Sequence, residues 1–168
     1  MNYFELFSMP VSFKPDKSLL KQKFYEVSRK FHPDFFGNAT EAEQAEALET
    51  SSLINTAYKI LTDDDATIKY LLQQKQLLED DEKYNLPQDF LMDMLDINDA
   101  ADEAKSSDNA ASIKNIQSSI LNLQSQIYAP VVQIIQNYKD GITTEEELLQ
   151  VKDYYFKKKY LTRILDGL

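Results

Sequence analysis

The sequence predicts an all-α fold, and three observations support this prediction. The chain has few residues that break helices, with three glycines and five prolines among 168 residues. Apolar residues recur at spacings of three and four over long stretches, while few segments show the alternation typical of strands. Hydrophobic residues make up 43% of the chain, which suffices for a packed core. We therefore expect an amino-terminal helical hairpin in residues 1–76, a linker at 77–86 and a three-helix bundle in 87–168.

An amphipathic helix is predicted between Lys17 and Phe31, where apolar residues recur at spacings of four, three and four. Asp16 is placed to cap its first turn. The helix carries five positive charges against one negative, a local excess of cations in a chain of net charge −10. This surface would steer the helix towards an acidic protein partner. The alternative is an ordinary solvated helix face. The cations are Lys17, Lys21, Lys23, Arg29 and Lys30.

The only histidine follows this helix, in the tripeptide His32-Pro33-Asp34. Pro33 should end the helix, because the residue before a proline disfavours the α conformation, and this leaves His32 and Asp34 on a loop. Thr40 and Glu43 have the spacing of a capping box for a second helix. Two helices joined by a polar loop form an αα-hairpin. By itself the tripeptide also fits an ordinary polar turn. The expected inward residues of the second helix are Ile54, Ala57, Tyr58 and Leu61.

Three further helices are predicted in the second half of the chain. The first spans residues 87–105 and the second, strongly periodic, spans 110–138. Pro130 lies within the second helix and should kink it. Thr144 and Glu147 form another capping box, which starts a last helix. The expected inner residues of that helix are Leu148, Val151, Tyr155 and Leu165.

The helix at 87–105 has two apolar stripes, although a surface helix needs only one. The second stripe holds Leu91, Met92 and Leu95, with Asp96 and Asp99 beside it. It indicates either a partner-binding site or a helix that is more buried than its neighbours. The residues expected to face the core are Phe90, Met94, Ile97, Ala101 and Ala104.

Phe156 poses a similar choice in the last helix. It falls off the predicted inner side, near Leu149 and Tyr160. It is either an exposed aromatic anchor for a partner or a residue covered by the linker.

Composition excludes several functions. Without cysteine the chain forms no disulfide and ligates no metal or iron–sulfur cluster through thiolates, so no cofactor or metal is expected, and a cytoplasmic location is consistent with this. No apolar run reaches membrane-spanning length, and the start lacks the features of a signal peptide. The negative net charge argues against general binding to nucleic acid or to anionic membranes. An enzyme using His32 and Asp34 as base and orienting group is disfavoured, because no nucleophile or phosphate loop accompanies them.

The first part of the chain resembles the J-domain of DnaJ-type co-chaperones. The resemblance covers Tyr3-Phe4-Glu5-Leu6-Phe7, the basic helix, His32-Pro33-Asp34 and the segment 54–61. It implies that the loop and the basic helix bind a DnaK-type chaperone ATPase and stimulate ATP hydrolysis. The residues expected to bind the chaperone are His32, Pro33, Asp34, Lys21, Arg29 and Lys30.

Two further segments, 68–72 and 90–96, are similar to the HscB (Hsc20) family in particular. That resemblance implies a non-enzymatic co-chaperone that brings an IscU-like iron–sulfur scaffold protein to an HscA-like, DnaK-type chaperone. Aspartate replaces the more common glutamate at Asp96 and Asp99, which shortens the reach of both carboxylates. The alternatives are a J-protein with other clients and a helical adaptor without effect on an ATPase. The residues expected to bind the scaffold are Leu91, Met92, Leu95, Asp96, Asp99 and Phe156.

Overall fold

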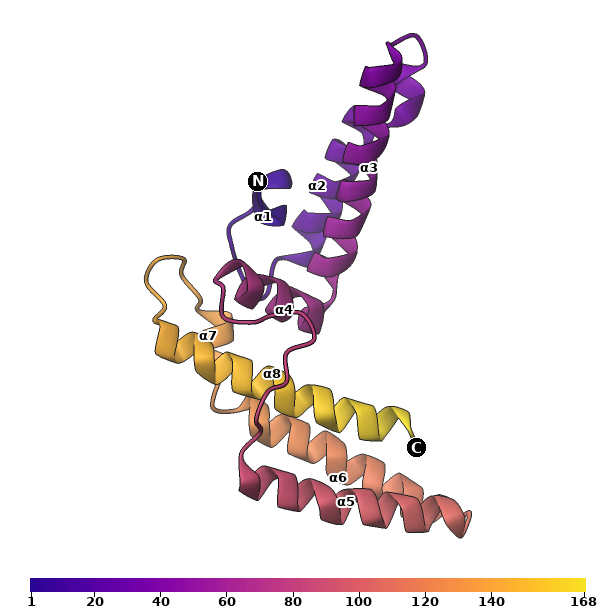
Figure 1. Cartoon of the computed structure of the whole chain (residues 1–168), viewed down its shortest axis with the longest axis vertical. Coiled ribbons are helices and arrows are strands. Elements are labelled where there is room, and N and C mark those ends of the chain that lie inside the picture. The colour runs from indigo at the N-terminus through magenta and orange to yellow at the C-terminus, as the bar shows by residue number, and fades with distance from the viewer. The chain divides into compact units, whose positions relative to one another are not determined.

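The computed structural model describes all 168 residues and contains helices joined by turns, with no strand. The predicted all-α class is therefore confirmed. The chain divides into two compact units (Figure 1), of which unit 1 comprises Met1–Gln74 and Tyr138–Ile142. Unit 2 comprises Lys75–Asn137 and Thr143–Leu168. Residues 77–86, expected from the sequence to be a linker, thus fall within unit 2.

Unit 1 is built around an antiparallel helical hairpin. In Figure 1 its two long helices, α2 and α3, run side by side, and the turn between them forms the tip. The expected caps are present, since the Asp16 side chain accepts a hydrogen bond from the backbone N–H of Leu19, and Thr40 and Glu43 form a reciprocal capping box. The helices of unit 1 are α1 (Tyr3–Leu6), α2 (Lys17–Lys30), the 3₁₀ helix η1 (Pro33–Phe36), α3 (Glu41–Thr62) and α4 (Asp64–Gln74).

The core of unit 1 lies at the base of the hairpin. Three phenylalanines from the amino-terminal segment are packed there with apolar residues of α2, α3 and α4. Burying a side chain of this size stabilises the fold by roughly 1.5–3 kcal/mol. Two stacked pairs of rings extend the core, Phe24 on Tyr58 at 4.1 Å and Tyr3 on Tyr70 at 4.3 Å between centroids. The largest fully buried side chains of unit 1 are Phe4, Phe7, Phe13, Leu20, Ile54, Leu61, Leu71 and Leu72.

Unit 2 is a bundle of three long helices, as predicted. Figure 1 shows α5, α6 and α8 side by side, and their shared core contains Met94, Ile120 and Leu161. Thr144 and Glu147 form the expected capping box at the start of α8. The helices of unit 2 are α5 (Gln88–Ser106), α6 (Ala110–Tyr128), α7 (Val132–Gln136) and α8 (Glu145–Asp166).

The prediction of one kinked helix over residues 110–138 was wrong. The helix ends at Tyr128, and the short α7 begins only at Val132. Pro130 lies in the intervening turn, where the backbone N–H of Val131 donates to the carbonyl of Tyr128. A proline lacks the N–H that would continue the helix and its ring crowds the preceding turn, so the chain breaks here and does not merely bend.

The inner face of α8 also differs from the prediction. Leu148 and Val151 are buried as expected, but the next buried residues are Tyr154 and Leu161. Tyr155, expected to face inward, is only partly buried. The reason is that burial advances from Val151 by three residues, to Tyr154, where the prediction assumed a step of four. Both steps keep residues on one side of a helix.

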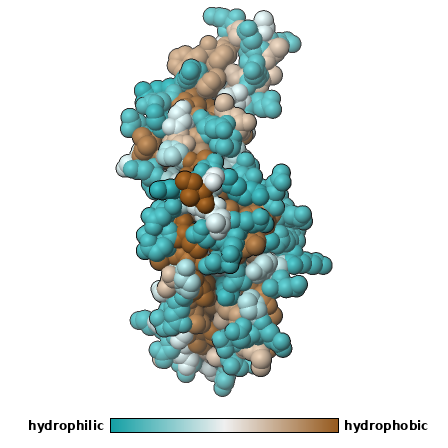
Figure 2. Space-filling view, turned by 90° about the vertical axis from the view of Figure 1, so that its left-hand side faces the viewer, coloured by the Kyte–Doolittle hydropathy of each residue, from teal (hydrophilic) through white to brown (hydrophobic).

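The face of the molecule drawn in Figure 2 is largely hydrophilic. Hydrophobic residues appear on this face as smaller patches among the hydrophilic ones. None of the helices combines the length and apolarity that crossing a bilayer requires.

Candidate functional site

The tripeptide His32-Pro33-Asp34 forms the tight turn at the tip of the hairpin. Helix α2 ends at Lys30, and His32 caps the short helix η1, whose first residue is Pro33. The ring Nδ1 of His32 accepts a hydrogen bond from the backbone N–H of Asp34 at 3.2 Å. The carboxylate of Asp34 lies 3.5 Å from the same Nδ1 atom. The turn therefore holds both side chains against each other without burying either.

The chemistry available at this turn is that of recognition. The side chains of His32 and Asp34 are 51% and 90% exposed, so the imidazole Nε2 and the carboxylate remain available to a partner. When the ring is neutral and Nδ1 accepts the hydrogen bond from the backbone N–H of Asp34, the ring proton is on Nε2. No group of three or more histidine or acidic residues is arranged to hold a metal ion.

Phe35 is a functional candidate that the sequence analysis missed. It lies directly after the tripeptide and is 73% exposed. Its ring meets the ring of His32 edge-on at 6.5 Å. The available signal was the pair of adjacent phenylalanines after Asp34, because two neighbouring residues of a helix point in different directions. In the structure Phe36 is partly buried and Phe35 is exposed.

Some of the cations of α2 contact partners within the chain, and others do not. Lys21 and Arg29 are exposed and form no ion pair within the chain, and Lys30 lies 5.8 Å from the ring of Phe31. Lys17 instead contacts the end of α3, and Lys23 pairs with Glu26 at 3.9 Å. The residues that remain available to an acidic partner are thus the three expected from the sequence. Arg29 and Lys30 lie next to the His-Pro-Asp turn, whereas Lys21 lies nearer the start of α2.

The second apolar stripe of α5 is exposed. Leu91, Met92 and Leu95 are 38%, 61% and 60% accessible, while Met94 on the opposite stripe is buried. The alternative of a more deeply buried helix is therefore excluded for these three residues. Asp96 and Asp99 are exposed beside them. The structure brings these five predicted residues together on one helix, and their binding role stays a prediction.

Phe156 lies on α8 and is covered in part by the segment before α5. The ring of Tyr84 stacks on it with 4.5 Å between centroids and 9° between planes. The Tyr84 hydroxyl donates a hydrogen bond of 2.8 Å to Asp153, one turn earlier on α8. The sequence left open an exposed anchor and a residue covered by the linker. The structure shows partial coverage by Tyr84 and leaves the Phe156 side chain partly exposed.

Electrostatics reinforce this attachment. The ammonium of Lys152 pairs with the carboxylate of Glu82 at 2.7 Å. Burial raises the pKa of Glu82, but hydrogen bonds from Lys152 and from the backbone N–H of Glu79 outweigh it, so the pKa falls below its ordinary value. The pKa of Tyr84 is raised to about 12, mainly because the hydroxyl is partly buried and secondly because it donates a hydrogen bond to Asp153.

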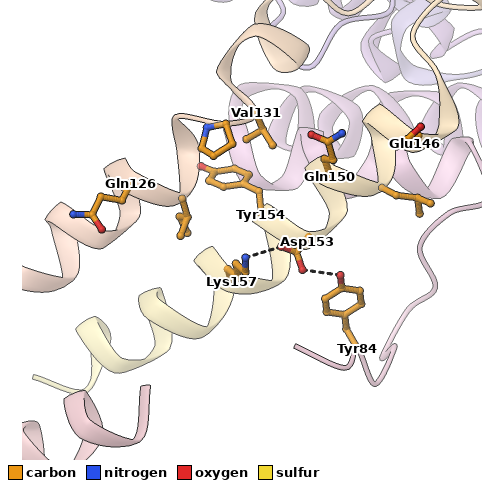
Figure 3. A pocket seen from close by; sticks show the side chains of 11 residues that line it. Tyr84, Gln126, Val131, Glu146, Gln150, Asp153, Tyr154 and Lys157 are labelled. Carbon is orange, nitrogen blue, oxygen red and sulfur yellow. Dashed lines mark hydrogen bonds and ion pairs between the residues drawn. The ribbon is translucent and has the colours of Figure 1, made fainter. Parts of the chain in front are cut away.

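A groove of about 580 Å³ lies beside Tyr84 in unit 2. Figure 3 shows Tyr84 and Lys157 on either side of Asp153, which both contact through the interactions marked there. Leu149, Ile127 and Val131 contribute apolar surface to its lining. No local pattern in the sequence points to Tyr84, because its partner Asp153 lies 69 residues further along the chain.

The chain resembles known co-chaperones in comparisons of sequence. A family model described as the HSCB C-terminal oligomerisation domain matches residues 86–168. A co-chaperone protein HscB homolog from Vibrio parahaemolyticus is 30% identical over 147 residues, which cover 86% of this chain and 84% of the relative. The homolog from Vibrio vulnificus strain CMCP6 is 29% identical, and the match covers 98% of this chain and 92% of the relative.

Solved structures agree with this result. The chaperone HscB from Vibrio cholerae superposes with a TM-score of 0.74 at 27% identity, covering 99% of this chain and 94% of that one. The human co-chaperone protein HscB superposes with a TM-score of 0.81 at 24% identity, and the match covers 99% of this chain and 80% of that one. At this identity the likeness supports the fold alone.

An exposed His-Pro-Asp turn on a helical hairpin, together with a separate helical unit that matches known co-chaperones, defines the class of this protein as a co-chaperone. More narrowly, the chain belongs to the HscB family.

Proposed function

We propose that this protein delivers an IscU-like iron–sulfur scaffold protein to an HscA-like, DnaK-type chaperone and stimulates the ATPase of that chaperone. Unit 1 would engage the ATPase through His32, Pro33 and Asp34, with Lys21, Arg29 and Lys30 alongside. Unit 2 would hold the scaffold through Leu91, Met92, Leu95, Asp96, Asp99 and Phe156. Membership of the HscB family supports both assignments.

The observation that carries this proposal is the exposure of two surfaces with different chemistry. The turn at His32 is polar and flanked by unpaired cations, whereas the stripe at Leu91 and Leu95 is apolar. An apolar patch on a surface helix commonly marks a protein interface, and Met92 supplies an adaptable contact within it.

Neither surface needs a catalytic group of this chain. Binding to the ATPase would favour its hydrolysis-competent state, since a ligand shifts an equilibrium towards the state that it binds better. Linking the scaffold to the same molecule raises its effective concentration at the chaperone. The phosphoryl transfer itself would remain the work of the chaperone.

Single-turnover ATP hydrolysis by an HscA-like chaperone tests the proposal. We expect the full chain to accelerate hydrolysis, and to accelerate it further when an IscU-like scaffold is present. No acceleration under either condition would reject the proposal. Acceleration without any binding of the scaffold would favour a J-protein that serves other clients.

A further inference from the structure

We propose that Tyr84 is part of the scaffold-binding surface and acts there as a positioning residue for Phe156. This inference rests on the proposed function, because it takes the scaffold as the partner of α5 and α8. It adds to that surface a segment of the chain that precedes the three-helix bundle.

The segment around Tyr84 is attached to α8 through two neighbouring residues of that helix, Lys152 and Asp153. Glu82 pairs with Lys152 at 2.7 Å, and the two side chains are only 20% and 15% exposed. The Tyr84 hydroxyl donates to Asp153, whose second oxygen pairs with Lys157 at 2.8 Å. Ion pairs shielded from water are screened less than exposed ones. The segment is therefore held on α8 and does not hang free beside it.

This attachment fixes the orientation of Phe156. One face of its ring lies against the ring of Tyr84, with 4.5 Å between centroids, and Tyr155 meets it edge-on at 5.2 Å. The ring of Phe156 is nevertheless partly exposed. A side chain that is already ordered loses less conformational entropy when a partner binds. Tyr84 thus prepares Phe156 for binding and leaves part of it accessible.

The flank of α5 that carries Leu91 and Leu95 is joined to α8 near Phe156. Leu91, Leu95 and Asn98 follow at spacings of four and three and therefore share one flank of that helix. The amide of Asn98 donates to the hydroxyl of Tyr160 at 3.2 Å, which places this flank beside α8. Phe156 lies one turn before Tyr160 on α8.

A scaffold seated on this flank would therefore also reach Phe156 and Tyr84. Both aromatic residues are partly exposed and belong to the same unit as Leu91 and Leu95. Aromatic residues with restricted side chains are frequent among the residues that dominate binding energy. The occupant that this surface fits is the partner already proposed for α5.

Titration calorimetry of the full chain with an IscU-like scaffold tests the inference. Tyr84→Ala should lower the affinity about tenfold, the loss typical of a central interface residue. Tyr84→Phe keeps the stacked ring and should restore the affinity to within about twofold. In a Phe156→Ala background, Tyr84→Ala should have little further effect, because residues that act through one another are not additive.

A matched control is available in unit 1. Tyr3 stacks on Tyr70 with the same 9° between planes and 4.3 Å between centroids. Tyr3→Ala should reduce stability and leave the scaffold affinity unchanged. Circular dichroism checks each variant, and if Tyr84→Ala loses helicity, Tyr84→Leu takes its place because it keeps apolar volume without the ring.

Two results would overturn the inference alone. One is an unchanged affinity in a folded Tyr84→Ala or Tyr84→Leu protein while Phe156→Ala weakens binding. The other is tighter binding by Tyr84→Ala, which would make the segment a cover that the scaffold must displace. A wild-type chain that does not bind the scaffold would overturn the proposed function and the inference together.

Discussion

The Nζ atom of Lys17 lies 2.8 Å from the carbonyl oxygen of Thr62, the last residue of α3. It also contacts the carbonyl of Leu61 at 3.2 Å and the carboxylate of Asp64, the first residue of α4, at 3.1 Å. A cation at the carboxyl end of a helix satisfies its last carbonyl groups and interacts favourably with the helix dipole. Lys17 therefore joins the start of α2 to the junction of α3 and α4.

Lys17→Ala should lower the free energy of unfolding by about 1 kcal/mol, the upper part of the range for a half-exposed charge at a helix end. Lys21→Ala is the matched control, since Lys21 lies one turn further along α2 without a partner. It should change stability by less than about 0.5 kcal/mol. Urea denaturation followed by circular dichroism measures both. Equal effects of the two substitutions would contradict the structural role of Lys17.

Lys21 and Arg29 should instead control the rate at which the chain meets its chaperone. Both are exposed cations in a chain of net charge −10. Steering by such charges is screened as ionic strength rises. Association measured by stopped flow should slow with added salt, and Lys21→Ala with Arg29→Ala should slow it further and flatten its salt dependence. Rates that do not vary with salt would remove the steering hypothesis.

Local signals in the sequence predicted most of the fold. The two predicted capping boxes, at Thr40 and at Thr144, are where spacing placed them, and so is the predicted cap at Asp16. Such signals work because the groups that interact lie within one turn of each other. For Leu91 and Leu95, periodicity showed only that their stripe was surplus to the one that faces the core. It left open whether that stripe was exposed or buried, and the structure shows that it is exposed.

What the sequence did not predict depends on distant parts of the chain. Tyr84 and Asp153 are 69 residues apart, and no local pattern pairs them. The choice between Tyr154 and Tyr155 as the buried residue of α8 depends on how α8 meets its neighbours, not on its own period. At Pro130 the period of 3.6 continues across the proline, so apolar spacing alone concealed the break.

The Tyr84 hydroxyl offers a test by pH. The pKa of this group is raised from 10.0 to about 12 in the folded chain, so folding favours the neutral form. By linkage, its contribution to stability is complete below pH 10 and is lost as pH rises towards 12. The difference in phenolate absorbance between wild type and Tyr84→Phe should show one late-titrating tyrosine. A difference titration centred on the ordinary value would contradict the contact with Asp153.

Leu91→Ala combined with Leu95→Ala should weaken binding of an IscU-like scaffold by about 2 kcal/mol or more, as for residues that dominate an interface. The fold should survive, because both side chains are exposed. Leu121→Ala is the control, since Leu121 is 54% exposed and belongs to α6, not to the stripe of α5. Calorimetric titration measures the affinities. A loss equal in the control and the double variant would remove the assignment of this stripe to the scaffold.

Asp34→Asn should abolish stimulation of the chaperone ATPase and leave scaffold binding intact. The side chain of Asp34 is 90% exposed, so the substitution removes a charge without disturbing the core. The hydrogen bond to Nδ1 of His32 comes from the backbone N–H of Asp34 and is therefore kept. Changes in separate units that share no partner act nearly independently, so the surface on α5 should be unaffected. His32→Gln should have the same effect on stimulation, although it also alters the cap of η1.

Single-turnover ATP hydrolysis at saturating scaffold measures the loss, with circular dichroism as the control for folding. If folded Asp34→Asn stimulates as wild type does, the turn is an ordinary polar one, and the chain would serve its scaffold as a helical adaptor.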